Sequence, residues 1–129
     1  MYLVDTSVWI EVFSKPSRIA LEELPDPDEI VTCLPVIQEV LQGFRDQIAF
    51  IKAREAMFSF PTIESPLRRQ VFEEAVQLYR SARRMGLTIR SGVDCLIAAC
   101  AIRHQLEVLH IDRDFDLLAL VSPLSVRSL

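Results

Sequence analysis

Four acidic residues stand where predicted strands end or predicted helices begin. They are Asp5, Glu39, Asp94 and Asp112. Carboxylates gathered at one place repel each other unless a cation lies between them, and hard oxygen ligands suit Mg²⁺ or Mn²⁺. A metal ion held in this way can activate water and stabilise charge on a phosphate group. The leading hypothesis from these residues is therefore metal-dependent cleavage of a phosphodiester bond.

The elements that would position these acids alternate between strand and helix. Asp5 directly follows the short apolar run 2–4, and Asp112 follows the apolar run 107–111. Apolar and β-branched patterning predicts further strands at 29–33, 61–63 and 125–129, and helical periodicity predicts helices at 8–13, 18–24, 35–43, 44–58, 65–84 and 92–104, with a short helix ending at residue 120. This alternation predicts an α/β domain with a mostly parallel sheet. Ligands of such sheets bind beyond the carboxyl ends of the strands, where all four acids are expected.

Each acid also has a structural interpretation. Asp5 could cap a helix, Asp112 could start a turn, and Asp94 could complement a helix dipole. Glu39 could be a solvated helix residue. However, both Glu39 and Asp94 border an apolar stripe, where a carboxylate costs free energy unless it is paired or liganded. Arg90 is the nearest cation to Asp94, and it could form a salt bridge with an acid or hold a substrate phosphate. Both alternatives remain open from the sequence.

Length and composition limit the class of protein. A chain of 129 residues corresponds to one domain, 1–129, and half of its residues are apolar. No apolar run approaches the roughly 20 residues of a membrane helix, and no basic stretch precedes the first apolar residues. The odd number of cysteines, Cys33, Cys95 and Cys100, argues against a disulfide framework or a zinc site. We therefore expect a cytoplasmic protein with its cysteines in the core.

Four motifs together resemble a PIN domain. They are Val4-Asp5-Thr6-Ser7, Glu39 within a helix, Val93-Asp94-Cys95-Leu96-Ile97-Ala98-Ala99, and Asp112-Arg113-Asp114-Phe115. The length and the opening residues are most similar to the VapC toxins of VapBC toxin–antitoxin modules, and the resemblance spans nearly the whole chain. It implies a three-layer α/β/α sandwich and a metal-dependent endoribonuclease using Mg²⁺ or Mn²⁺.

The resemblance also assigns roles to individual residues. Asp5, Asp94 and Asp112 are expected to contact the metal directly or through water, with Glu39 in that shell or next to it. Thr6 matches a small hydroxyl residue beside the first acid, and Asp114 ranks below Asp112 because this position is more variable in the family. His110 stands where the family often has Thr or Ser, so its role is open. Mutual repulsion is expected to raise the pKa of some of these acids when no metal is bound.

The resemblance further implies an RNA substrate, a homodimer and a cognate antitoxin whose tail blocks the acidic site. The net charge of −4 is unlike that of a general nucleic-acid binder, but twelve of the fourteen basic residues are arginines, whose planar fork suits phosphate. Large aromatic residues are frequent in the first half of the chain, and some are expected at a contact surface. These residues are Trp9, Phe13, Phe44, Phe50, Phe58 and Phe60.

Four alternatives to a metal-dependent nuclease have less support from the sequence. A receiver or phosphatase on a similar sheet would need a functional lysine late in the chain, whereas the last one is Lys52. A nucleotide-binding domain would need a glycine-rich loop, but the three glycines are isolated. An inert interaction module would explain the apolar excess without explaining the acids. A ribonuclease based on the histidine pair His104 and His110 has little support from their positions.

Overall fold

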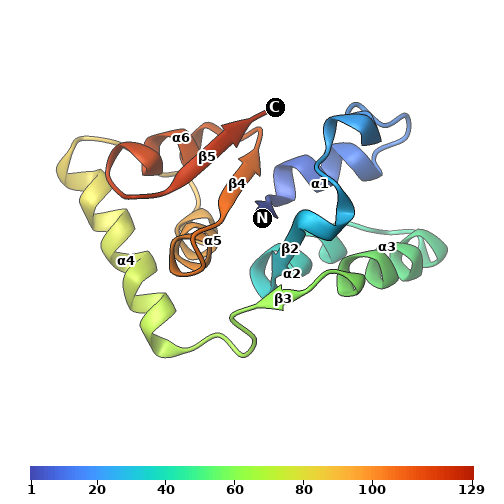
Figure 1. Ribbon diagram of the computed structural model, residues 1–129, viewed down its shortest axis with the longest axis horizontal. Coiled ribbons are helices and arrows are strands. Elements are labelled where there is room, and N and C mark those ends of the chain that lie inside the picture. Colours follow the sequence, from blue (N-terminus) through green and yellow to red (C-terminus); the bar gives the residue numbers. More distant parts are fainter.

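The computed structural model describes residues 1–129 and is built on a five-stranded parallel sheet (Figure 1). Its strands are β1 (Tyr2–Val4), β2 (Ile30–Cys33), β3 (Thr62–Ile63), β4 (Glu107–His110) and β5 (Ser125–Ser128), in the order β3-β2-β1-β4-β5. The chain runs outward from β1 to β3 and then returns to place β4 on the other side of β1. This reversal between β1 and β4 creates the switch point at which open α/β sheets bind ligands.

Six helices surround the sheet to give the three-layer α/β/α arrangement. They are α1 (Thr6–Phe13), α2 (Leu34–Gln42), α3 (Gln47–Ser59), α4 (Arg69–Arg84), α5 (Gly92–Arg103) and α6 (Arg113–Leu120). Helix α4 packs along α5, and α5 also contacts α2 and α6. None of these helices combines the length and the apolar character needed to cross a membrane.

The central strands are buried on both faces, which explains why polar and apolar residues do not alternate along them. All four residues of β2 and three of the four in β4 are buried, as expected for parallel strands that are covered on both faces. Helix α5 is also buried along most of its length, and its small residues 98–101 let it approach its neighbours closely. The three cysteines are unpaired and buried, so the expectation of core cysteines is confirmed.

Two predicted helices differ most from the structure. The helix predicted at 65–84 begins only at Arg69, because Arg68 is extended and Leu67 packs against the core from the preceding loop. The segment 18–24 contains only a 3₁₀ turn, Leu21–Glu23, because only Ile19 is buried there, Leu24 is partly buried, and no apolar stripe is present. Gly86 follows the C-cap residue Met85 and adopts a φ of 75°, which glycine allows without steric cost, so α4 ends there.

The aromatic residues of the first half mostly pack against each other. Trp9 is buried, and its ring centroid lies 5.9 Å from that of Phe13 and 5.4 Å from that of Phe60. Phe58 is half exposed, with the Arg54 guanidinium 5.2 Å from its ring centroid. A further exposed apolar group, which the sequence analysis did not single out, lies on α4 and comprises Phe72, Val76 and Tyr79.

Candidate active site

The ends of β1 and β4 carry two of the predicted acids to the switch point. The Asp5 backbone N–H donates a 2.9 Å hydrogen bond to the Leu109 carbonyl, which joins the end of β1 to β4. Asp5 caps α1, and Asp112 caps α6 by accepting a 3.0 Å hydrogen bond from the Asp114 N–H. The structural roles considered for these two residues are therefore real. A carboxylate has two oxygens, however, and a cap uses only one of them.

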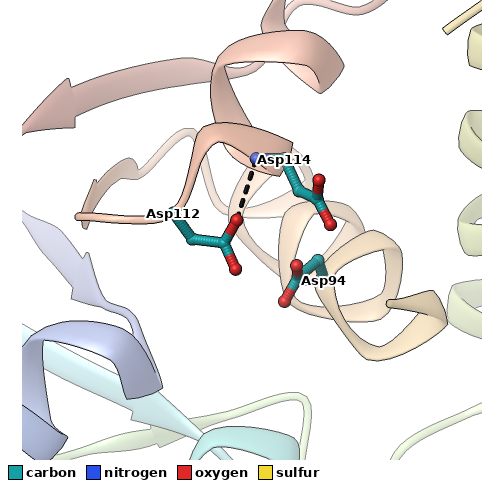
Figure 2. Close-up of side chains that lie close together, drawn as sticks. All are labelled: Asp94, Asp112 and Asp114. Carbon is teal, nitrogen blue, oxygen red and sulfur yellow. Dashed lines mark hydrogen bonds between the residues drawn. The ribbon is translucent and has the colours of Figure 1, made fainter. Parts of the chain in front are cut away.

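Three carboxylates meet beside this point. Asp94, in the first turn of α5, faces Asp112 and Asp114 at the start of α6 (Figure 2). One oxygen from each of the three lies within 4.8 Å of the others. Asp94 is 5% exposed and Asp114 is 1% exposed, whereas Asp112 is partly open to solvent. The structure thus gives Asp114 a central place that the sequence analysis ranked below that of Asp112.

Asp5 and Glu39 lie outside this close group but are electrostatically coupled to it. The Asp5 Oδ2 atom accepts hydrogen bonds from the Ser7 N–H at 3.0 Å and from the Ser7 hydroxyl at 2.6 Å. The Thr6 hydroxyl donates a 2.8 Å hydrogen bond to Glu39 Oε1. The start of α1 therefore orients both acids, Asp5 through Ser7 and Glu39 through Thr6.

The pKa values of three acids are raised. Burial raises the pKa of Asp94 to about 8, and the charges of Asp5 and Asp112 add to this effect. Burial also raises the pKa of Asp5, although the Ser7 hydrogen bonds oppose it. The pKa of Glu39 rises for the same main reason, against the Thr6 hydrogen bond and with a contribution from Asp5. Burial is thus a larger cause than the mutual repulsion named in the sequence analysis.

Three buried carboxylate oxygens have no hydrogen-bond donor. They are Asp5 Oδ1, Asp94 Oδ2 and Asp114 Oδ1. Buried oxygens of this kind are costly unless a cation or donor meets them, and only Asp114 Oδ1 has a cation nearby, the Arg90 Nε atom at 3.5 Å. Asp94, Asp112 and Asp114 each bring one carboxylate oxygen within 4.8 Å of the other two, and carboxylate oxygens are the ligands that a hard divalent ion prefers. The residues therefore fit a divalent metal ion.

Arg90 lies at the open side of the group. Its side chain is 61% exposed, and one terminal nitrogen lies 3.2 Å from Asp112 Oδ1 while Nε lies 3.5 Å from Asp114 Oδ1. Its backbone N–H donates a 3.0 Å hydrogen bond to Asp114 Oδ2. Of the two alternatives for Arg90, the salt bridge is thus present in the structure.

Ser7 is a further residue of the site, and its role was not predicted from the sequence. Its hydroxyl donates to Asp5 and also accepts a 3.2 Å hydrogen bond from the Ile111 N–H, so it joins the first acid to the turn that carries Asp112. The signal in the sequence is the spacing Asp5-x-Ser7 at a helix start, where a hydroxyl and a cap lie close together. The partner at Ile111, 104 residues away, has no such signal.

Comparison with known proteins identifies the family. The PIN domain family model matches residues 2–120. The chain is 36% identical to VapC ribonuclease Mb1587 of Mycobacterium bovis, covering 99% of this chain and 98% of that relative. It is 34% identical to ribonuclease VapC51 of Mycobacterium tuberculosis, over 94% and 87% of the two chains. The structure of VapBC-1 from nontypeable Haemophilus influenzae superposes with a TM-score of 0.75 at 17% identity, over 98% and 96% of the chains. This chain therefore belongs to the PIN domain family, among its VapC ribonucleases.

Proposed function

We propose that this protein is a metal-dependent endoribonuclease and the toxin of a toxin–antitoxin pair. Its metal, Mg²⁺ or Mn²⁺, would be held by Asp5, Asp94 and Asp112, with Asp114 added to this set on the basis of its position. The observation that carries the proposal is the set of three buried carboxylate oxygens without donors at the β1–β4 switch point. The membership in the VapC ribonucleases supports RNA as the substrate.

The chemistry follows from what these residues can hold. A bound divalent ion supplies an activated water and stabilises charge on the phosphate. Ser7 holds one Asp5 oxygen in place and leaves the other without a donor. Glu39 stands beside the acids with Oε1 fixed by Thr6, and its raised pKa suits it to take up a proton at the edge of the site.

The test is cleavage of a loop-containing RNA by the purified protein with Mn²⁺, with Mg²⁺ or with EDTA. We expect cleavage with either ion and none with EDTA. The expected products carry no 2′,3′-cyclic phosphate, because water rather than the ribose 2′-hydroxyl attacks. Cleavage that persists in EDTA, or products that end in a 2′,3′-cyclic phosphate, would contradict the proposal and favour the histidine-pair alternative.

Arg90 provides a separate prediction about substrate binding. If its exposed guanidinium also holds a phosphate, Arg90→Ala weakens RNA binding and lowers the slope of log affinity against log salt by about 1. The matched control is Arg45→Ala, since Arg45 is exposed and has no ion pair. An unchanged salt slope together with lower stability would show that Arg90 only pairs with the acids.

The partners we propose are an antitoxin and a second copy of this chain, both in the cytoplasm. An antitoxin that blocks the site would present a basic side chain, because carboxylate oxygens without donors attract cations. Arg90 already makes this type of contact from within the chain. The exposed apolar side chains of α4 are suited to covering by another chain.

A further inference from the structure

His110, the last residue of β4, has an unusual place next to the acidic site. Its side chain is completely buried and packs against Phe115, with the ring centroids 5.4 Å apart. The ring nitrogen Nδ1 accepts a 3.1 Å hydrogen bond from the backbone N–H of Asp112. The imidazole therefore contacts the main chain of Asp112, which is itself one of the acids of the site.

This hydrogen bond determines which ring nitrogen carries the hydrogen. A backbone N–H can only donate, so Nδ1 carries no hydrogen and the neutral ring has its hydrogen on Nε2. Nε2 lies 3.2 Å from Asp116 Oδ1, although the alignment is not that of a regular hydrogen bond. The carboxylate on this side favours the tautomer that leaves Nδ1 free to accept from Asp112.

Neighbouring contacts hold the rest of the same turn. The Ile111 N–H donates to the Ser7 hydroxyl, and the Asp114 N–H donates to Asp112 Oδ1. The Asp112 N–H lies between these two, and its acceptor is His110. Every one of these three acceptors is a side chain, so the turn from β4 into α6 is shaped by side chains.

We propose that His110 is a positioning residue that fixes this turn, so that the Asp112 carboxylate faces Asp94 and Asp114. The inference rests on the proposed metal site and adds to it a residue that touches neither metal nor substrate. Without an acceptor at this place, the Asp112 N–H loses its partner, and the backbone that directs the carboxylate keeps only the contacts through Ser7 and Asp114. Metal sites tolerate displacements of only about 0.5 Å in their ligands. A Ser or Thr hydroxyl at position 110 can also accept a hydrogen bond from the backbone N–H two residues later. The contact therefore needs only a side-chain acceptor at this position.

The experiment compares two amide substitutions of similar polarity. In His110→Asn the side-chain oxygen can take the place of Nδ1 and accept from the Asp112 N–H. In His110→Gln the longer side chain carries its amide toward the place of Nε2 and leaves the N–H without that acceptor. Mn²⁺ affinity is measured by calorimetry on the purified proteins, and urea unfolding reports their stability.

We expect His110→Gln to bind Mn²⁺ about 10-fold to 100-fold more weakly, the usual effect of losing a residue that orients a ligand. His110→Asn should stay within about threefold of the native affinity. His104→Gln is the matched control, because His104 lies at the far end of α5 and contacts Glu64 instead. Equal Mn²⁺ affinity in the Gln and Asn variants, with both folded, would overturn the proposal.

A measurement without metal separates this inference from the proposed function. Nitrogen NMR of the native imidazole should show hydrogen on Nε2 only, and amide exchange at Asp112 should be faster in His110→Gln than in His110→Asn. If the native protein bound no Mn²⁺, the proposed metal site would be wrong. The amide exchange rates at Asp112 would still show whether His110 holds the turn. Equal exchange at Asp112 in the native protein and in His110→Gln would overturn the role of His110.

Discussion

Replacement of Asp94 by asparagine is expected to reduce RNA cleavage by about 10³-fold. Asp94 is 5% exposed, faces both Asp112 and Asp114, and has one oxygen without a donor. A metal ion contributes several kcal/mol of charge stabilisation in the transition state, and about 4 kcal/mol corresponds to 10³ in rate. Asparagine has the same shape but no charge, so the fold should persist while the metal affinity falls. The cleavage rate at saturating RNA and the Mn²⁺ affinity are the quantities to measure.

The matched control is Asp28→Asn, which makes the same chemical change at an exposed carboxylate just before the start of β2, whereas the acidic site lies beyond the carboxyl ends of the strands. This variant should retain native activity and native Mn²⁺ affinity. Full cleavage by Asp94→Asn would remove Asp94 from the proposed site. Loss of cleavage with unchanged Mn²⁺ affinity would instead place Asp94 in substrate binding and leave the metal with the other acids.

Much of the fold follows from local patterns in the sequence. Continuous apolar runs mark the buried strands, because a parallel sheet covered on both faces leaves no polar side. An acid directly after such a run, as at Asp5 and Asp112, is placed at the carboxyl edge by chain connectivity alone. The start of α4 was misplaced because the extended conformation of Arg68 depends on tertiary packing of Leu67, which propensity does not record.

The details of the acidic site were harder to obtain from sequence. Asp112 and Asp114 are two residues apart, and which of them faces Asp94 depends on the turn that joins β4 to α6. The structure places both there, because Asp112 caps the helix while Asp114 points inward. The acceptors of that turn, Ser7 and His110, act through single hydrogen bonds to backbone groups. Contacts of this kind leave no periodic pattern in a sequence.

The metal-free protein is expected to become less stable as the pH rises from about 4 to about 8. Burial and neighbouring charges raise the pKa of Asp94 to about 8 in the folded state, from an ordinary value of 3.8. Between these values the folded state holds a proton that the unfolded state has released, so stability falls with rising pH. The contribution of this carboxyl is fully present below about pH 4 and is lost above about pH 8. The steepest slope from one such group is about 1.4 kcal/mol per pH unit.

Urea unfolding in EDTA at several pH values between 5 and 8 measures this slope. Asp5 and Glu39 contribute in the same direction, since burial raises the pKa of each in the folded state. The slope that remains in Asp94→Asn therefore reports the other groups, and its difference from the native slope reports Asp94 together with its coupling to Asp5 and Asp112. Asp28→Asn, which changes an exposed carboxyl, should keep the full native slope.

Added Mn²⁺ should reverse the trend, because a metal ion binds the ionised carboxylates and competes with the proton on Asp94. At a free ion concentration 100 times the Kd, binding to the folded state alone adds about 2.7 kcal/mol of stability. The stability gained from Mn²⁺ should be larger at pH 8 than at pH 5, since a smaller fraction of Asp94 is protonated at the higher pH. A stability in EDTA that stays flat or increases from pH 5 to pH 8 would contradict the raised pKa of Asp94. A gain from Mn²⁺ that is equal at both pH values would mean that the ion binds without displacing that proton, away from Asp94.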